Sequence, residues 1–130
     1  NFASKADSAV FVQQLGQSAM EIDSAWMHVR RAISDIDVTA QQQELSGFDK
    51  ARIQADCGHA MGLLRSATSR LMDIAGPGAF ASANSLQRLW RDLNVGSRHT
   101  YLSCPLSEEL YGRALTGLES TMANLADVRH

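Results

Sequence analysis

Two arginines and a histidine carry the clearest chemical signal in the sequence. Arg88 and Arg91 are three residues apart, so on a helix they share one face. Guanidinium groups bind phosphates and carboxylates through paired hydrogen bonds, so this face could hold an anionic ligand. His99 follows beside Arg98, and its imidazole could donate or accept a proton near neutral pH. The alternative is a solvated helix face, paired with Asp92, and a helix-end histidine without a ligand.

The residues around these three suggest how they are positioned. Trp90 lies between the arginines but on the apolar side of the helix, with Leu86 and Leu93. Core packing is the first interpretation of Trp90, although an indole ring also stacks on flat cofactor rings. Upstream, Gly76-Pro77-Gly78 ends a helix, because proline cannot continue the hydrogen-bond ladder and glycine supplies the reversed backbone angle. A glycine-rich break therefore opens onto the helix that carries these side chains.

The remaining histidines and cysteines show no pattern typical of a metal site or a nucleophile. His59 follows Cys57, but a single Cys-x-His pair is a weak metal signal and the sequence contains no second pair. Cys57 also falls on an apolar helix stripe, which disfavours a reactive thiol. His28 precedes Arg30 and Arg31 on a helix, and we expect it to be exposed. The sequence therefore predicts no metal site.

Composition limits the classes of protein to which the chain can belong. It has 130 residues, of which 45% are hydrophobic and 20% charged, as in a globular domain. A net charge of −2 disfavours a nucleic-acid surface, and no apolar run reaches the roughly 18 residues of a membrane span. The two cysteines form no Cys-x-x-Cys pair, which indicates reduced thiols in a cytoplasmic protein. Because the first residue is Asn1, we expect residues 1–130 to be one domain of a longer polypeptide.

Apolar periodicity predicts four helices. The first helix carries the stripe Phe11, Leu15, Ile22, Trp26, Val29, Ile33 and Ile36. The second carries Ile53, Cys57, Ala60, Leu64, Ala67, Leu71 and Ile74. A polar connection over residues 37–46 separates the two. The third helix is expected to begin near Ser82 or Asn84, and the fourth near Pro105, a favoured first-turn residue, and to extend to Met122.

Short connections between the last three helices predict an all-α fold, an antiparallel up-and-down four-helix bundle. No useful run alternates apolar and polar residues as a half-buried strand would. Small residues recur on more than one face of the second helix, for example Ala55, Gly58, Ala60 and Gly62. We therefore expect this helix to be packed on several sides.

The segment Ala75-Gly-Pro-Gly-Ala-Phe80, followed by Leu86-Gln-Arg-Leu-Trp-Arg-Asp92, resembles the C-terminal helical domain of the acyl-CoA dehydrogenase superfamily. That family has a glycine-rich turn, then an arginine, then an Arg-Asp pair. The continuation through Arg98-His99 and residues 105–115 is similar to one branch, the oxygenase components of two-component flavin-dependent monooxygenases of the p-hydroxyphenylacetate hydroxylase and dibenzothiophene monooxygenase type. Many dehydrogenases place a catalytic glutamate shortly after the Arg-Asp pair, whereas residues 94–100 contain no carboxylate.

The resemblance implies a cofactor and roles for individual residues. Reduced flavin, either FMN or FAD, would come from a separate flavin reductase and react with oxygen to hydroxylate a small aromatic substrate. His99 would be catalytic, stabilising the peroxide or assisting the substrate proton. The residues that would line or brace the flavin site are Arg88, Trp90, Arg91, Gly76 and Gly78.

The resemblance also implies that other parts of the protein complete the site. An N-terminal helical domain and a β-domain would precede this one, and the whole would form a homodimer or homotetramer. The isolated domain is then expected to be inactive. Two alternatives stay open, namely a domain of an acyl-CoA dehydrogenase and a non-enzymatic helical oligomerisation module.

Overall fold

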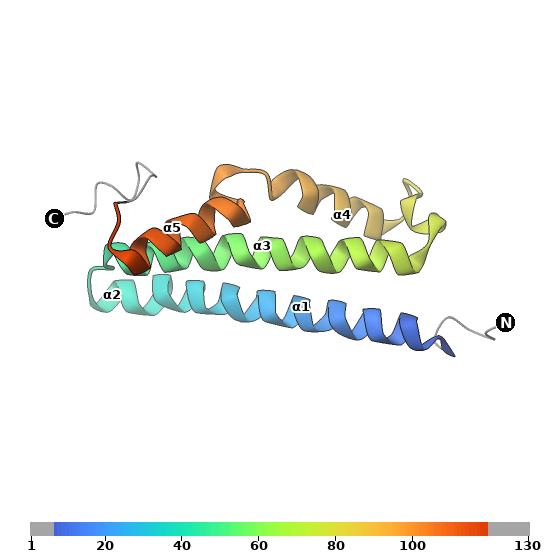
Figure 1. Ribbon diagram of the computed structural model, residues 1–130, viewed down its shortest axis with the longest axis horizontal. Coiled ribbons are helices and arrows are strands. Elements are labelled where there is room, and N and C mark those ends of the chain that lie inside the picture. The colour runs from blue at the N-terminus through green and yellow to red at the C-terminus, as the bar shows by residue number, and fades with distance from the viewer. Residues whose placement is uncertain (1–6, 120–130) are drawn as a thin grey trace.

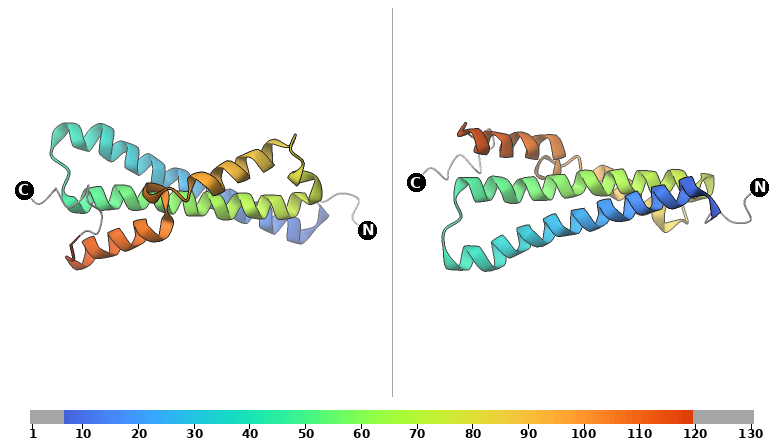
Figure 2. Two further views of the ribbon diagram at one scale, coloured as in Figure 1. Left: turned by 90° about the horizontal axis from the view of Figure 1, so that it is seen from above. Right: turned by 60° about the horizontal axis from the view of Figure 1, so that its bottom comes forward.

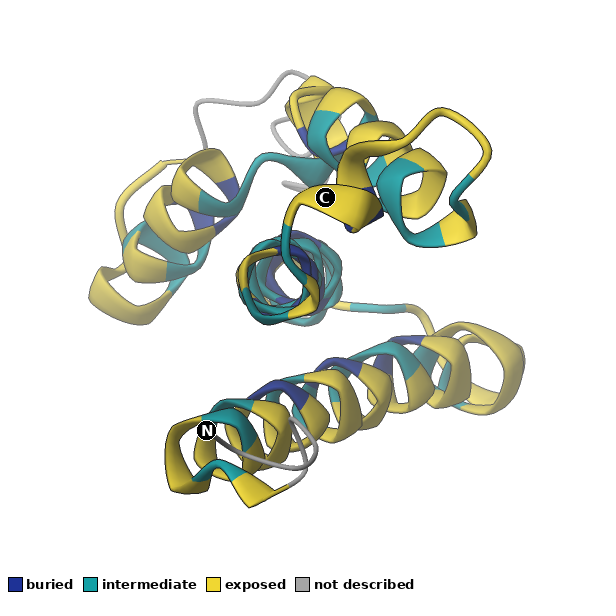
Figure 3. Ribbon diagram, turned by 90° about the vertical axis from the view of Figure 1, so that its right-hand side faces the viewer, coloured by how far each residue is buried: buried dark blue, intermediate teal, exposed yellow. Residues whose placement is uncertain are grey.

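A computed structural model describes residues 7–119, and regular structure within this range is entirely helical. The long helices are α1 (Ala9–Ser34) and α3 (Gly47–Ala75), followed by the shorter α4 (Ser85–Gly96) and α5 (Cys104–Thr116). Figure 1 shows α1 antiparallel to α3, with α4 and α5 placed one after the other along α3. The view in Figure 3 places α3 in the centre, with α1 on one side and α4 and α5 on the other. The predicted all-α fold of four packed helices is confirmed, with α3 packed on several sides.

The first helix extends further than the sequence pattern indicated. A π-helical turn (Asp35–Thr39) and the short α2 (Ala40–Gln42) continue α1, so the connection to α3 shrinks to residues 43–46. The expected polar connection over residues 37–46 was therefore wrong in its first half. Figure 2 shows that α1 crosses α3 at an angle and that the two helices lie furthest apart near α2.

Local capping interactions fix the ends of α3 and the start of α4. Ser46 and Asp49 form a capping box in which each side chain accepts a hydrogen bond from the other's backbone N–H, at 3.0 and 3.1 Å. The helix ends at Gly76, whose φ of +84° favours glycine. Asn84 caps α4 by accepting a hydrogen bond from the Leu86 N–H at 2.9 Å. The predicted break at Gly76 and a start near Asn84 are both confirmed.

Helix α5 begins as expected and ends early. Pro105 occupies its first turn, where a missing N–H costs nothing. The helix stops at Thr116 because Gly117 adopts a left-handed conformation, with φ +71°. Leu118 therefore lies beyond the helix, and Met122 lies outside the described residues.

The buried apolar residues are mostly alanines: Ala25, Ala32, Ala51, Ala55, Ala60, Ala67 and Ala79, with Met72 and Leu110. The large apolar residues of the α1 stripe are not among them. Leu15, Ile22, Ile33 and Ile36 are exposed, and Trp26 is 57% exposed. The stripe thus marked the helix correctly but not the face that contacts α3. Within the described range, no helix is both long and apolar enough to span a bilayer.

Candidate functional site

The face of α1 that contacts α3 consists of small and ionisable residues. Ser18, Ala25 and Ala32 are buried there and recur every seven residues. Glu21, His28 and Asp35 follow the same spacing three positions later, which keeps both sets on one seam between the helices. Each of these three pairs with α3: Glu21 with Arg70 at 2.6 Å, His28 with Asp56 at 2.7 Å, and Asp35 with Arg52 at 2.8 Å. We call this row the charged seam.

Asp56 is the most enclosed charge of the seam. Its side chain is 2% exposed, yet both carboxylate oxygens accept hydrogen bonds. The Arg31 Nε donates to Oδ2 at 2.8 Å, the Arg31 Nη2 donates to Oδ1 at 2.5 Å, and the His28 Nδ1 donates to the same Oδ1. Burial alone would raise the pKa of Asp56, but the hydrogen bonds from Arg31 and His28 outweigh burial and hold it below its ordinary value. Asp56 is therefore a structural anion that joins α1 to α3.

The pKa of Asp56 predicts that acid destabilises the α1–α3 contact. A carboxylate whose pKa is lower in the folded protein stabilises the fold above its unfolded pKa of about 4. That stabilisation is lost as pH falls through the folded value. We expect Asp56→Asn to cost about 1–3 kcal/mol of unfolding free energy at pH 7. The variant should also lose less stability between pH 5 and pH 2 than the wild type, in denaturant unfolding at each pH.

Asp23→Asn provides the matched control for this prediction. Asp23 is an exposed carboxylate on α1, the helix that Asp56 contacts, and we expect its variant to follow the wild-type acid profile. If Asp56→Asn loses as much unfolding free energy between pH 5 and pH 2 as the wild type does, Asp56 is not the source of this pH dependence.

A cavity of about 260 Å³ opens between α1, α3 and α5 beside the charged seam. Its lining includes Arg31, Arg52, His59, Glu108, Tyr111 and Leu115. Cationic and anionic groups therefore both line it, and α5 also contributes the apolar side chain of Leu115. This cavity could not be foreseen from the sequence, because its residues come from three separate helices.

The two arginines singled out in the sequence lie on the exposed surface of α4. The Arg91 Nε is 3.9 Å from the Asp92 carboxylate, and both side chains are mostly exposed. Within residues 7–119, no hydrogen bond or ion pair is found for the Arg88 side chain. Arg88 therefore has no partner in this range, and the ion pair of Arg91 is long and exposed, so both guanidinium groups are accessible to an anion from outside this chain segment.

The contacts of Trp90 and the backbone conformation of Gly76 serve the packing and the turn between α3 and α4. The Trp90 Nε1 donates to the Ser69 hydroxyl of α3 at 3.2 Å, and its ring meets Phe80 edge-on at 6.1 Å between centroids. These contacts pack α4 on α3, in agreement with the core-packing interpretation. Gly76 is needed for its positive φ, whereas a Cβ on Gly78 would meet nothing within 4 Å.

His99 is exposed and stands just beyond the end of α4. It caps a short 3-10 turn (Thr100–Leu102), and its Nδ1 accepts a hydrogen bond from the Tyr101 N–H at 3.4 Å. The two rings are stacked, 5.7 Å apart at an angle of 27°. With Nδ1 as the acceptor, the neutral ring carries its proton on Nε2. The hydrogen bond and the ring stacking orient His99, and its Nε2 has no hydrogen-bond partner within residues 7–119.

The structure corrects the expectation for His28 and gives His59 neighbours that the sequence did not indicate. The prediction that His28 is exposed was wrong, because its ring is 32% exposed and bonded to Asp56. The heptad spacing of Glu21, His28 and Asp35 was the signal that could have revealed the seam. His59 does not pair with Cys57, but lies beside Cys104 and Glu108 from α5.

Comparison with known proteins gives consistent matches. The model of the acyl-CoA dehydrogenase C-terminal domain matches residues 1–104. The oxygenase component of p-hydroxyphenylacetate 3-hydroxylase from Acinetobacter baumannii is 34% identical over 61 residues, which are 47% of this chain and 14% of that protein.

Two solved structures share the fold. XiaF from Streptomyces sp., in complex with FADH2 and glycerol, superposes with a TM-score of 0.90 and 37% identity over 94% of this chain. The HsaA monooxygenase from M. tuberculosis gives a TM-score of 0.79 and 25% identity over 90% of this chain. In both cases the chain spans 31% of the relative's length. This chain belongs to the acyl-CoA dehydrogenase C-terminal domain family.

Proposed function

We propose that this chain is the C-terminal domain of the oxygenase component of a two-component flavin-dependent monooxygenase. The whole protein would use reduced flavin and oxygen to hydroxylate a small aromatic substrate. The observation that carries the proposal is the agreement with XiaF, whose structure contains FADH2, at a TM-score of 0.90 over 94% of this chain. Another relative is named as the oxygenase component of p-hydroxyphenylacetate 3-hydroxylase.

The exposed surface of α4 supports flavin binding. Arg88 and Arg91 are exposed cations three residues apart, and their guanidinium groups suit the phosphate of a flavin nucleotide. When bound, the flavin supplies the redox chemistry with oxygen, and a separate reductase would deliver it in reduced form. Trp90 would brace this surface, because its N–H and ring are already engaged by Ser69 and Phe80. Gly76 and Gly78 would shape the turn that leads into α4.

His99 is the residue that we assign to proton chemistry. Its backbone position is fixed by the Thr100–Leu102 turn, and Nε2 is left to donate or take up a proton at the substrate. The segment 94–100 contains no carboxylate that could act as the base of an acyl-CoA dehydrogenase. This favours the monooxygenase over the dehydrogenase alternative.

The site would be completed by parts of the protein beyond this domain. The relatives are about three times as long, and the exposed α1 stripe offers apolar surface that a further domain or a second copy could cover. We therefore propose an N-terminal helical domain, a β-domain and a homo-oligomer, and we expect the isolated domain to be inactive. Cys57 and Cys104 are free thiols, which fits the cytoplasmic location that we also propose.

The proposal is tested with the full-length protein and chemically reduced flavin, without a reductase. We expect reduced FMN or FAD to bind and, in air-saturated buffer with a panel of phenols, to give hydroxylated product. Replacing Arg88 and Arg91 together with alanine should weaken reduced-flavin binding at least about tenfold, because charge-assisted hydrogen bonds are lost. Arg30→Ala, at an exposed arginine of α1, is the control. Desaturation of acyl-CoA substrates without any hydroxylated phenol would favour the dehydrogenase instead.

A further inference from the structure

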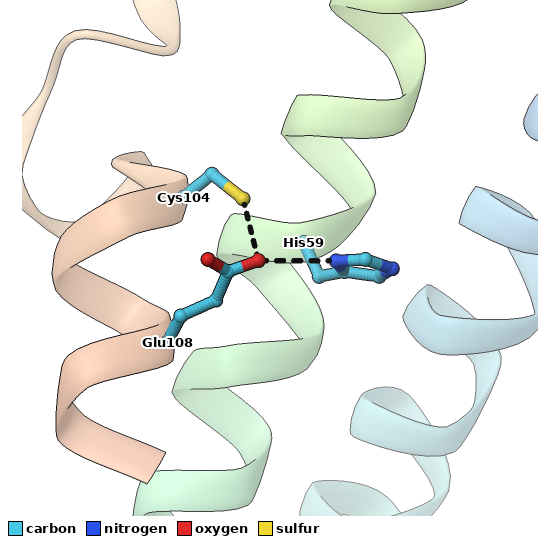
Figure 4. A group of neighbouring side chains, drawn as sticks. All are labelled: His59, Cys104 and Glu108. Atoms are coloured by element: carbon cyan, nitrogen blue, oxygen red, sulfur yellow. Dashed lines mark hydrogen bonds and ion pairs between the residues drawn. The ribbon is translucent and has the colours of Figure 1, made fainter. Parts of the chain in front are cut away.

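Three potential metal ligands from two helices meet on the side of the domain where α5 packs on α3. Figure 4 shows the Glu108 carboxylate of α5 between Cys104 of the same helix and His59 of α3. Cys104 and Glu108 are four residues apart, so their side chains lie on one face of α5. The approach of the helices is close, because a Cβ added to Gly62 would lie 3.0 Å from the Cys104 Sγ. The glycine of α3 thus makes room for the thiol.

The distances between the ligand atoms are near those of a tetrahedral site. The Cys104 Sγ lies 3.3 Å from the Glu108 Oε1, and the His59 Nδ1 lies 3.6 Å from the same oxygen. Zinc bonds of about 2.0–2.3 Å at tetrahedral angles require ligand atoms about 3.3–3.6 Å apart. All three ligand atoms lie within 4.8 Å of one another. Rotation of the half-exposed His59 ring would bring its Nδ1 closer to the Cys104 Sγ, the third pair of ligand atoms.

We propose that His59 Nδ1, Cys104 Sγ and the Glu108 carboxylate bind a divalent transition-metal ion of the zinc class. Sulfur, nitrogen and oxygen are the donor atoms that zinc accepts in proteins. Three protein ligands leave one tetrahedral position, which a water molecule fills. On binding, the Cys104 thiol gives up to solvent the proton that it now donates to Glu108, and the sulfur forms the bond to the metal as thiolate.

A second histidine, from α1, lies beside the ring of His59. His28 meets it edge-on, at 4.8 Å between ring centroids and an angle of 74°, and His28 is itself fixed by Asp56. The site therefore connects to the charged seam, and the metal would tie α5 to α3 at the edge of the cavity between α1, α3 and α5. The metal would bind here whether or not the protein uses flavin.

The test adds Co²⁺ to the reduced, metal-free full-length protein and follows the thiolate-to-cobalt charge-transfer band in the near ultraviolet. We expect the band in the wild type and its loss in Cys104→Ser. In His59→Ala and Glu108→Gln, the apparent affinity should fall at least about tenfold. Cys57→Ser is the matched control, because this half-buried thiol of α3 is not part of the cluster, and it should keep the band.

A second readout covers variants that could perturb folding. Zn²⁺ should raise the thermal midpoint of the wild type and of Cys57→Ser, since a ligand that binds the folded state stabilises it, but not that of Cys104→Ser. Circular dichroism checks that each variant is folded before titration. Absence of the band in the wild type, its survival in Cys104→Ser, or its equal loss in Cys57→Ser would overturn the proposal.

Discussion

Replacing His99 with alanine in the full-length protein is expected to abolish most hydroxylation while reduced flavin is still oxidised. Proton transfer by a positioned side chain contributes about 10²–10⁴-fold to a reaction, so product formation should fall by a factor in that range. Flavin oxidation would continue and release hydrogen peroxide, because oxygen still reacts with the bound cofactor. The measurement is the yield of hydroxylated product and of peroxide for each reduced flavin consumed. This prediction rests on the proposed function.

His99→Asn separates the chemical role of His99 from its capping role. The asparagine Oδ1 can accept the Tyr101 N–H as Nδ1 does now, so the Thr100–Leu102 turn should be retained. Asparagine cannot exchange a proton near neutral pH. We therefore expect His99→Asn to be as uncoupled as His99→Ala. An asparagine variant with wild-type product yield would show that His99 serves only as a cap.

Replacing Gly58 with alanine is expected to have the largest effect on the packing of α5. A Cβ at this position would overlap the Oγ and Cβ of Ser107 and lie 3.1 Å from the Ser103 carbonyl oxygen. Overpacking of this kind costs about 1–3 kcal/mol, and we expect the upper part of that range because a backbone atom limits relaxation. Amide hydrogen exchange should show α5 losing protection in the full-length protein, while the first half of α1 keeps it.

The control and the rescue for this substitution come from the same pair of helices. A Cβ on Gly112 of α5 meets nothing within 4 Å, so Gly112→Ala should be neutral or stabilise the helix by up to about 1 kcal/mol. Adding Ser107→Gly to Gly58→Ala removes the two overlapping atoms and should restore most of the protection. If the double variant is no more protected than Gly58→Ala alone, the contact with Ser107 is not the cause.

Local turn chemistry explains which parts of the fold could be predicted. Gly76, Asn84 and Pro105 determine helix ends through their own backbone properties, so the sequence alone placed these boundaries well. The continuation of α1 through Asp35–Thr39 was missed, because a π-helical turn of polar residues has no distinct pattern. The predicted fourth helix extended too far, because the apolar repeat continues past Gly117, where α5 ends.

The packing faces were harder to predict, because a periodic stripe marks a helix without identifying its partner. The stripe of α1 that includes Trp26 is exposed, while alanines and ion pairs form its contact with α3. Apolar surface of this kind suits contact with the further domains that we propose.

The candidate site likewise contains residues whose surroundings the sequence indicated and residues whose contacts it did not. Trp90 packs as its apolar neighbours indicated, and the exposure of Arg88 and Arg91 agrees with either interpretation of their shared face. The roles assigned to these arginines and to His99 stay predictions. The meeting of His59 with Cys104 could not be deduced, since it depends on how α5 packs against α3.

We propose that this domain belongs to a protein that passes oxygen from a reduced flavin to an aromatic ring. The most direct measurement is the amount of hydroxylated phenol formed by the full-length wild type per mole of added reduced flavin, with free flavin in buffer as the blank. The account predicts a yield well above the blank for at least one phenol. If every phenol in the panel gives no more product than the blank, although reduced flavin binds, the account is contradicted.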